Sequence, residues 1–413
     1  MSEEGLEQKY VKEAFDNNWV VPLGPNVNGF EQGLKTFLNG GQEGGSKEVV
    51  ALSSGTAAVH LALVACGVGP GDEVCVQSFT FCASAHPVTY LGAKPVFVDS
   101  EEDSWNMDPA MLETAIRDRI CRTGKKPKAI VAVALYGMPY DVEGLLQVAE
   151  RYDIPLIEDA AEGLGSSYKG QALGTFGRYG VLSFNGNKMI TTSGGGALVC
   201  PDRESWSTIM NYATQAREGY PYYQHERIGY NYRMSNVCAG IGRGQMSVLQ
   251  EHIEHHRHIA KLYERAFAGV PGITFHKGPD YAAAGSNYWL STITLAPELK
   301  VRGMEDAYFL ASDGAAVGGV AGVVHTAEAL HTDCEPNANV EAMRVGLDLA
   351  GIEARPLWKP MHRQPVYAGA PAYLHEPCVC ESIFLTGLCL PSGPMVTDAD
   401  VEYIVGTILS LIS

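Results

Sequence analysis

Short apolar segments alternate with helical patterns between residues 49 and 199. The segments expected to form strands are 49–52, 73–76, 95–98, 129–133, 155–158, 181–184 and 196–199. Apolar residues at helical spacing predict helices between them, including 57–66 and 142–152. Repeated strand and helix units of this kind build a mostly parallel sheet, and such sheets bind ligands beyond the carboxyl ends of their strands.

The pattern changes in the second half of the chain. A long helical stretch at 236–267 is followed by strands and turns, with an apolar run at 289–295. At 413 residues the chain is longer than one core usually supports. We therefore expect an α/β protein with a large, mostly parallel sheet domain at 1–255 and a smaller α+β domain at 256–413. The Ala- and Gly-rich segment 311–329 is compatible with helix, loop or insert.

Composition limits the kinds of molecule that the chain is expected to bind and the cellular compartment in which it is expected. The 47 acidic and 30 basic residues give a net charge of -17, which argues against binding to nucleic acid or to anionic lipid. The ten cysteines are scattered, and the close pair Cys378 and Cys380 has neither zinc-finger nor thioredoxin spacing. Free thiols, with no amino-terminal signal and no apolar segment of membrane-spanning length, predict a cytoplasmic protein that binds no membrane.

Lys188 follows a predicted strand and precedes a run of three glycines, residues 194–196. A lysine delivered to the mouth of the sheet in this way can bind a cofactor carbonyl as an imine and later act as a base. An exposed surface lysine is the alternative interpretation of the same residue.

Two further motifs directly follow strands of the same predicted sheet. Asp159 follows an apolar strand, where its carboxylate suits either a protonated pyridine nitrogen or the amino-terminal cap of a helix. Residues 53–58 form a strand-to-helix turn whose backbone amides suit a phosphate group. Since no G-x-G-x-x-G follows the first strand, the sequence argues against a nicotinamide-dependent dehydrogenase.

Taken in order, these motifs resemble the DegT/DnrJ/EryC1/StrS family of sugar aminotransferases over nearly the whole chain. The resemblance rests on residues 54–58, Thr80 with Phe81, residues 158–161, Ser183 with Lys188, and residues 229–234. Segments 183–188, 214–218, 286–291 and 355–359 most closely resemble the UDP-N-acetylbacillosamine transaminase branch.

This resemblance implies an aminotransferase of fold type I that uses pyridoxal 5'-phosphate. The implied reaction moves an amino group from L-glutamate to a nucleotide-linked 4-keto-6-deoxy sugar. The branch implies UDP-2-acetamido-2,6-dideoxy-4-keto-hexose as the substrate and a UDP-4-amino sugar as the product. A homodimer with shared active sites is also implied.

The resemblance assigns a role to individual residues. Lys188 would bind the cofactor covalently, and Asp159 would pair with its pyridine nitrogen. Other residues implied to contact the cofactor are Gly55, Thr56, Ala57, Phe81, Glu162, Ser183 and, from the neighbouring subunit, Asn231. Residues implied to contact the sugar nucleotide are Pro22, Leu23, Gly24, Pro25, Arg217, Arg355, Pro356, Leu357, Trp358 and His362.

Several alternatives remain open at this point. The sugar could be a 3-keto compound or the GDP-linked precursor of perosamine, and the chain could be a regulator that binds without turnover. The deoxygenating dehydratases that resemble this family have histidine where this chain has Lys188, which argues against that reaction. His252 and His256 have the spacing of a zinc pair, but the intervening residues favour a solvated polar helix face and no metal site.

Overall fold

The computed structural model describes residues 1–41, 46–283, 285–305 and 334–412. The expected segment 311–329 lies outside these residues. The strands expected between residues 49 and 199 are all present, with ends that differ from expectation by one or two residues. The α/β fold class of the aminotransferase type is confirmed.

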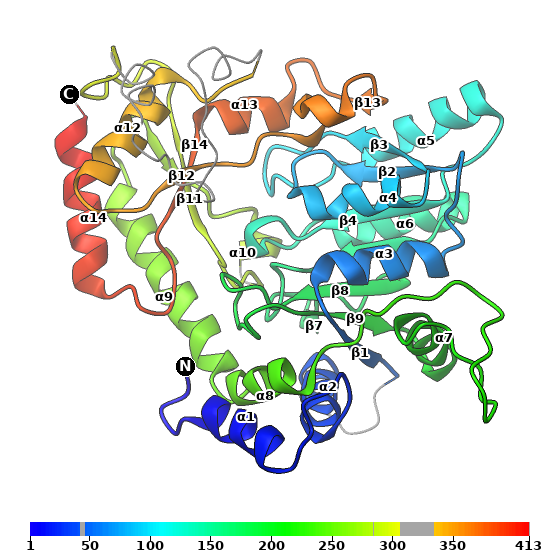
Figure 1. Cartoon of the computed structure of the whole chain (residues 1–413). Coiled ribbons are helices and arrows are strands. Elements are labelled where there is room, and N and C mark those ends of the chain that lie inside the picture. The colour runs from blue at the N-terminus through cyan, green and yellow to red at the C-terminus, as the bar shows by residue number, and fades with distance from the viewer. Residues whose placement is uncertain (42–45, 284, 306–333, 413) are drawn as a thin grey trace.

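An eight-stranded sheet forms the centre of the larger unit (Figure 1). In spatial order its strands are β1 (Glu48–Leu52), β9 (Gly196–Cys200), β8 (Tyr179–Ser183), β5 (Leu156–Asp159), β4 (Ala129–Val133), β2 (Glu73–Gln77), β3 (Lys94–Val98) and β13 (Ala372–Tyr373). β9 runs antiparallel to both of its neighbours, whereas the pairs from β8 to β13 are parallel. Strands β3 and β4 are almost wholly buried, as expected for parallel strands in a sheet covered on both faces, whereas the edge strand β13 is not.

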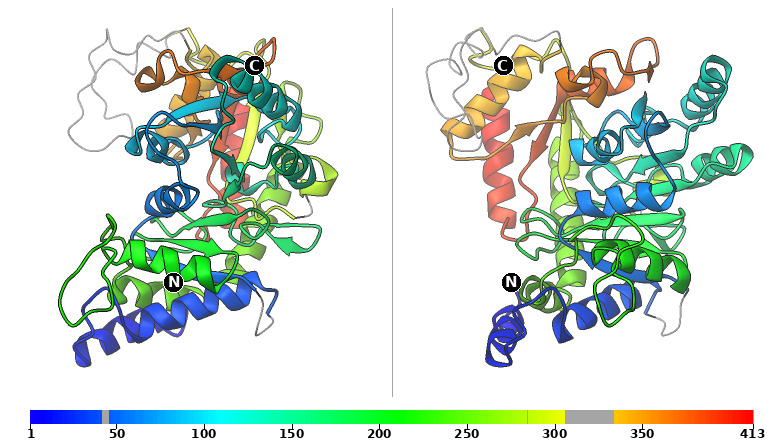
Figure 2. Two further views of the ribbon diagram at one scale, coloured as in Figure 1. Left: turned by 90° about the vertical axis from the view of Figure 1, so that its right-hand side faces the viewer. Right: turned by 45° about the vertical axis from the view of Figure 1, so that its right-hand side comes forward.

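Helices cover the two faces of this sheet. Phe30, Leu112 and Leu145 pack on one face, and Leu61 and Ile209 pack on the other. The helices of the larger unit are α1 (Leu6–Asp16), α2 (Pro25–Leu38), α3 (Gly55–Ala65), α4 (His86–Tyr90), α5 (Pro109–Thr123), α6 (Val142–Tyr152), α7 (Arg203–Ala213) and α8 (Asn236–Gln245). The views in Figure 2 show these helices as layers around the sheet.

The carboxyl-terminal part of the chain forms a smaller unit with its own core. Its antiparallel sheet has the order β10 (Ile273–Phe275), β11 (Ser291–Leu295), β14 (Gly387–Leu390) and β12 (Arg355–Pro356). Its helices are α9 (Leu249–Phe267), α12 (Ala338–Leu349), α13 (Val379–Thr386) and α14 (Asp398–Leu411). The chain also forms a short helix α10 (Asp280–Ala283) and a hairpin of β6 (Ser167–Tyr168) and β7 (Gln171–Ala172).

The chain passes between the two units more than once. The predicted boundary between residues 255 and 256 lies inside α9, which runs from α8 to the side of α14 (Figure 1). β13 then returns to pair with β3 at the edge of the large sheet. The division at this residue therefore stays a prediction.

One predicted helix is divided in the structure. The expected helix at 236–267 is divided into two helices, because the helical backbone is interrupted between Gln245 and Leu249. Ser247 lies in the break, where its hydroxyl donates to the backbone oxygen of Gly244 at 2.7 Å. This side-chain bond competes with the helical backbone pattern. The apolar run 289–295 likewise becomes a strand only from Ser291.

The prediction of a solvated histidine face on this helix is wrong for two of its members. His252 is 9% exposed and His256 is 4% exposed. Their Nδ1 atoms lie 3.1 Å from the Met189 oxygen and 3.2 Å from the Tyr288 oxygen, respectively. Helix α9 therefore packs against loops on a side that the sequence pattern suggested was polar and exposed.

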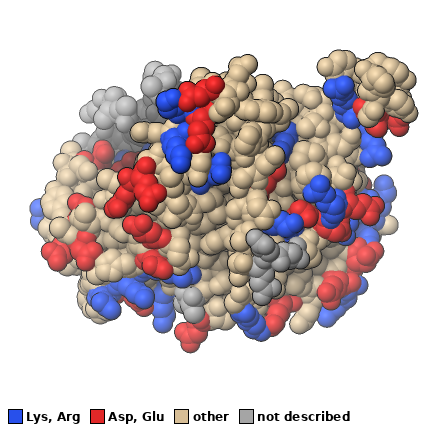
Figure 3. Space-filling view, turned by 90° about the horizontal axis from the view of Figure 1, so that it is seen from below, with Lys and Arg blue, Asp and Glu red and all other residues tan. Residues whose placement is uncertain are grey.

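The surface carries both signs of charge. On the face in Figure 3, Lys and Arg lie among Asp and Glu and are not collected into one basic patch. Among the described helices, none combines the length and the hydrophobicity that a membrane crossing requires.

Candidate active site

A cavity of about 870 Å³ lies where the carboxyl ends of β5 and β8 meet the first turn of α3. The smaller unit closes it from the opposite side. Residues that line it from the larger unit include Gly55, Thr56, Phe81, Asp159, Glu162, Ser183 and Lys188, and those from the smaller unit include Arg355, Pro356, Trp358 and Cys389. The position agrees with the rule that open α/β sheets bind ligands beyond the carboxyl ends of their strands.

Lys188 projects into this cavity from the loop after β8. A turn in which its backbone nitrogen donates to the Asn185 oxygen at 3.0 Å sets its direction. The Lys188 Nζ lies 3.3 Å from Glu162 Oε1 and 4.0 Å from the centroid of the Trp289 ring. Its side chain is only 12% exposed, so the interpretation as a surface lysine does not hold.

Glu162 is held between Lys188 and the loop after β4. Its Oε2 accepts a hydrogen bond from the Tyr136 backbone nitrogen at 2.7 Å. Asn287 Nδ2 donates to the Glu162 backbone oxygen at 2.7 Å, which fixes the segment that carries the carboxylate. Burial raises the pKa of Glu162, and the charge on Lys188 partly opposes that rise.

Asp159 is the last residue of β5, and it is 4% exposed. Ser84 Oγ donates to its Oδ2 at 2.7 Å, and the Ala161 backbone nitrogen donates to its Oδ1 at 3.2 Å. Burial raises the pKa of Asp159, while these two donors and Lys188 lower it. A carboxylate held this way favours a cationic partner, because such a partner lowers the cost of keeping its charge buried.

The first turn of α3 provides backbone donors beside Ser183. Ser54 caps the helix by accepting from the Ala57 nitrogen at 3.0 Å, so the Ala57 donor is engaged within the turn. Gly55 packs closely on β8, since a Cβ added there would lie 3.0 Å from the Ser183 Cβ. The turn at Gly55 and Thr56 thus meets the cavity with a helix amino terminus, a favourable place for an anion.

Comparison with known proteins is decisive for the family. The DegT/DnrJ/EryC1/StrS aminotransferase family matches residues 2–333 and 323–409 of the chain. The chain belongs to this family. It is 43% identical over 409 residues to EpsN of Bacillus subtilis (strain 168), classed as a pyridoxal phosphate-dependent aminotransferase; the match covers 98% of this chain and 93% of EpsN.

Two other relatives of the DegT/DnrJ/EryC1/StrS family support the same assignment. The GDP-perosamine synthase of Caulobacter vibrioides is 33% identical over 406 residues, covering 98% of this chain and 95% of the synthase. A DegT DnrJ EryC1 StrS aminotransferase from Brucella abortus has a crystal structure that matches with a TM-score of 0.81. That pair is 27% identical, and the match covers 98% of this chain and 95% of the Brucella chain.

The cofactor of this family's aminotransferases is pyridoxal 5'-phosphate, and the residues present fit it. Lys188 would supply the amine, and the buried carboxylate of Asp159 would pair with the pyridine nitrogen. The first turn of α3 with Ser183 supplies donors suited to the phosphate. When bound, the cofactor acts as an electron sink for the amino acid carbon that loses its proton.

Aromatic side chains cover the side of the cavity that faces the smaller unit. The Trp358 ring lies 5.5 Å from Phe81 and 5.0 Å from Tyr136 between centroids. The Trp358 backbone nitrogen donates to the Tyr136 hydroxyl at 3.0 Å, which ties the two units together at the site. Arg355 also lines the cavity and is paired with Glu353.

Other residues expected to contact the sugar nucleotide, together with Asn231, which was expected to contact the cofactor, gather elsewhere. Pro22, Leu23, Arg217 and Asn231 line a second cavity of about 620 Å³, and none of them lines the first. Gly24 has φ 140°, and a Cβ there would lie 2.6 Å from Asn236 Oδ1, so this turn requires glycine. Pro25 follows as the first residue of α2.

Two of the expected residues are packed away from both cavities. Leu357 is 2% exposed and belongs to the core. His362 is held by two partners, with Nδ1 2.7 Å from Ser78 Oγ and Nε2 2.8 Å from Glu381 Oε1. Their contact with a sugar nucleotide stays a prediction, and the observed role of His362 is to join segments distant in sequence.

Several residues of the site had no individual prediction. Trp289 and Asn287 lie in the segment 286–291 that carries part of the family resemblance, and that signal could have identified them. Ser84 and Tyr136 had no such signal, because they reach Asp159 and Glu162 only through tertiary contacts.

Proposed function

We propose that the chain transfers the amino group of L-glutamate to a nucleotide-linked 4-keto-6-deoxy sugar. The proposed substrate is UDP-2-acetamido-2,6-dideoxy-4-keto-hexose, and the product is the UDP-4-amino sugar. The observation that carries the aminotransferase part is Lys188, buried in a cavity with Asp159 and 3.3 Å from Glu162. The UDP-linked sugar is proposed from the resemblance of segments 183–188, 214–218, 286–291 and 355–359.

The residues of the cavity divide the chemical work. Lys188 Nζ takes a proton from the carbon that bears the amino group and later returns it. Glu162 accepts a hydrogen bond from Lys188 Nζ. This bond holds the Lys188 side chain in place both before and after Nζ takes up the proton. Asp159 keeps the pyridine nitrogen protonated, and the aromatic wall at Trp358 restricts water.

Recognition of an anionic substrate must work against a net charge of -17. Arg355 and Trp358 supply a guanidinium and an indole on one wall of the first cavity. A guanidinium suits a pyrophosphate, and an indole face suits a nucleobase. Both residues therefore support a nucleotide-linked substrate without selecting uracil over guanine.

A GDP-linked substrate is the second candidate because of one specific observation. The GDP-perosamine synthase of Caulobacter vibrioides matches 98% of the chain at 33% identity. The UDP-2-acetamido-2-deoxy-3-oxo-D-glucuronate aminotransferase of Pseudomonas aeruginosa is 36% identical, but the match covers 60% of this chain. A 3-keto UDP sugar is therefore the third compound to test.

We further propose a homodimer in which Asn231 serves the cofactor phosphate of the partner's site. The second cavity supports this arrangement, because residues expected to contact ligand line it together and lie outside the Lys188 cavity. Its wall also includes Leu23 and Tyr220, which are 55% and 45% exposed and so present apolar surface that a second chain can cover.

The test is amino transfer by the purified holoenzyme from L-glutamate to the three keto-sugars. Release of 2-oxoglutarate and the mass of the sugar product are measured together. We expect the UDP-4-keto-6-deoxy sugar to give the highest kcat/KM. A higher value with the GDP-linked 4-keto sugar would replace the proposed substrate, and sugar binding without release of 2-oxoglutarate would favour a regulator.

A further inference from the structure

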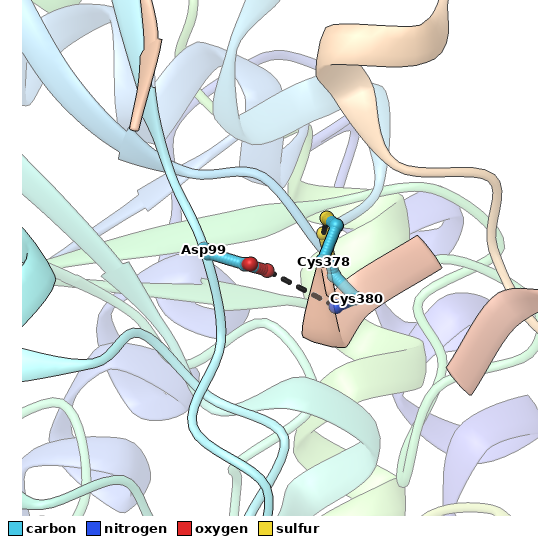
Figure 4. A group of neighbouring side chains, drawn as sticks. All are labelled: Asp99, Cys378 and Cys380. Atoms are coloured by element: carbon cyan, nitrogen blue, oxygen red, sulfur yellow. Dashed lines mark hydrogen bonds between the residues drawn. The ribbon is translucent and has the colours of Figure 1, made fainter. Parts of the chain in front are cut away.

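Two thiols meet at the start of α13, outside the cavity that holds Lys188. Cys378 is the residue before the helix, and Cys380 lies in its first turn. Their Sγ atoms are 3.6 Å apart, and both cysteines are unbonded thiols in this structure. Figure 4 shows both side chains next to Asp99, with the two sulfur atoms on the same side.

The two thiols differ in access to solvent. Cys378 is partly exposed, whereas Cys380 is fully buried. An oxidant arriving from solvent can therefore reach Cys378, and Cys380 is placed to react with it from inside the protein. The pair has the asymmetry of an attacking and a resolving cysteine.

The surroundings of Cys378 favour its ionised form. The neighbouring Cys380 thiol, opposed by burial and supported by His362, lowers the pKa of Cys378 to about 7. A ring nitrogen of His362 lies within 4.8 Å of the Cys378 sulfur. Cys378 also precedes the first turn of α13, where the helix dipole stabilises negative charge.

Asp99 holds this turn in place through its backbone. Its Oδ1 accepts from the nitrogens of Ser100 and Cys380, and its Oδ2 accepts from those of His375 and Val379. These four bonds lie between 2.8 and 3.1 Å. The thiols are therefore presented by a fixed backbone and not by a loosely held loop.

A metal ion is the other ligand that such side chains suggest, but the polar atoms already have partners. The oxygens of Asp99 are used by four backbone donors. His362 is bonded at both nitrogens, and Glu381 Oε2 accepts from Arg363 at 2.8 Å. A bound metal ion would have to displace these hydrogen bonds, whereas a disulfide between Cys378 and Cys380 can form without breaking any of them.

We propose that Cys378 and Cys380 form a peroxide-reactive dithiol that closes to an intrachain disulfide. The Cys378 thiolate attacks one peroxide oxygen, the O–O bond breaks, and Cys378 becomes a sulfenic acid as hydroxide leaves. The Cys380 sulfur, losing its proton, then attacks the Cys378 sulfur and displaces the oxygen as water. Each disulfide formed consumes one peroxide, and a dithiol reductant reverses the oxidation.

Closure requires only a small movement. The sulfur atoms must approach from 3.6 Å to a bond length of about 2.05 Å, which is within reach of rotation of the two side chains about their Cα–Cβ bonds. Thiols of proteins in a reducing compartment form such bonds transiently, in response to oxidant.

In the test, the full-length holoenzyme is first treated with hydrogen peroxide. The thiols that remain are then blocked, and the protein is digested. Trypsin cleaves after Arg363 and the protease Glu-C cleaves after Glu381, while Pro377 protects the bond after Glu376. The resulting peptide 364–381 contains Cys378 and Cys380 and no other cysteine. We expect this peptide to lose two hydrogen atoms in oxidised protein and to regain them after treatment with dithiothreitol.

Variants separate the two roles. Cys380→Ser should accumulate a sulfenic acid at residue 378 that dimedone traps, and Cys378→Ser should leave Cys380 reduced because it is buried. Cys121→Ser is the matched control, since Cys121 is an exposed thiol, and it should leave the disulfide yield unchanged. The visible absorbance of the bound cofactor checks that each variant is folded.

Three results would overturn the proposal. The first is a rate of oxidation at Cys378 no higher than that at Cys121. The second is equal oxidation of Cys380 in the Cys378→Ser variant. The third is retention of one Zn²⁺ per chain through desalting, with both thiols protected from alkylation, which would make the cluster a metal site.

Discussion

The Lys188 cavity and the cavity lined by Asn231 are built in different ways. The Lys188 cavity is formed by strand ends, a helix amino terminus and a wall from the smaller unit, and its charged groups are buried and hydrogen-bonded. The second cavity is lined largely by loop residues, among which Arg217 and Asn231 are exposed. The first cavity thus brings together buried reactive groups, whereas the second presents exposed side chains, and only the first could react without a further chain under the proposed function.

The largest effect should come from removing the amine of the first cavity. Lys188→Ala should lower kcat by about 10⁴-fold, because the group proposed to move the proton is lost. The imine absorbance of the cofactor should also disappear while the far-ultraviolet circular dichroism stays unchanged. Lys169→Ala is the control, since Lys169 is 62% exposed and pairs with Glu143. Normal turnover of the Lys188→Ala variant would remove the lysine from the mechanism.

Asp159→Asn should have the next largest effect within the same cavity. An amide keeps the shape of the carboxylate but not its charge, and loss of one partner of a buried ion pair costs about 3 kcal/mol, or roughly 10²-fold in rate. Single-turnover rates of both half-reactions should fall by this factor, with a smaller change in cofactor affinity. Asp153→Asn is the control, because the Asp153 side chain is 99% exposed. Equal loss in both variants would assign Asp159 a structural role.

Hybrid dimers test whether the second cavity belongs to the partner's site. Lys188→Ala chains are mixed with Asn231→Asp chains, in which the new carboxylate should repel the cofactor phosphate. If sites are shared, each hybrid contains one site with both defects and one site with neither. We therefore expect activity to return to about half of that of the unmodified dimer. Verified hybrids without recovered activity would show that each chain completes its own sites.

The smallest effect concerns the helices that support the second cavity. Glu7 is buried against α8, where Gln245 Nε2 donates to its Oε1 at 2.6 Å. Burial raises the pKa of Glu7, but hydrogen bonds from Ser2 and Gln245 outweigh it and bring the pKa from 4.5 to about 2. The stabilisation is therefore complete above the unfolded pKa and is lost as the pH falls toward the folded one.

Glu7→Gln should accordingly lower the free energy of unfolding near neutral pH by about 2 kcal/mol. The difference from the unmodified chain should shrink as the pH falls below 4.5. Urea denaturation at several pH values measures it, with Glu4→Gln as an exposed control. A difference that is independent of pH would mean that Glu7 contributes through packing and not through its charge.

The sequence predicted the first cavity far better than the second. Lys188 and Asp159 were placed at the mouth of the sheet by the predicted strands, and the family resemblance added Ser183; in the structure all three line the same cavity. The second cavity joins Leu23 to Asn231, two residues on loops with no shared periodic pattern. Their proximity depends on how α2 and α8 pack, for example through the buried Asn236, and local pattern does not encode that packing.

The sequence also did not predict which charged and polar groups are buried. The histidine spacing on α9 indicated a polar face, yet the structure buries His252 and His256 because loops from two distant segments cover them. Glu162 was expected beside the cofactor, but its bond to the Tyr136 nitrogen could not be foreseen. Such contacts join residues far apart in sequence, where only the folded chain brings a donor and an acceptor together.

The return of β13 to the large sheet has a consequence for synthesis on the ribosome. β3 pairs with β2 early in the chain, and within the part of the chain that the structure describes its other edge pairs with Ala372 and Tyr373 of β13. While the intervening segment is still being translated, this edge exposes unpaired backbone groups that another strand can join. A nascent chain that stalls before residue 372 therefore lacks the strand that pairs with this edge of the sheet.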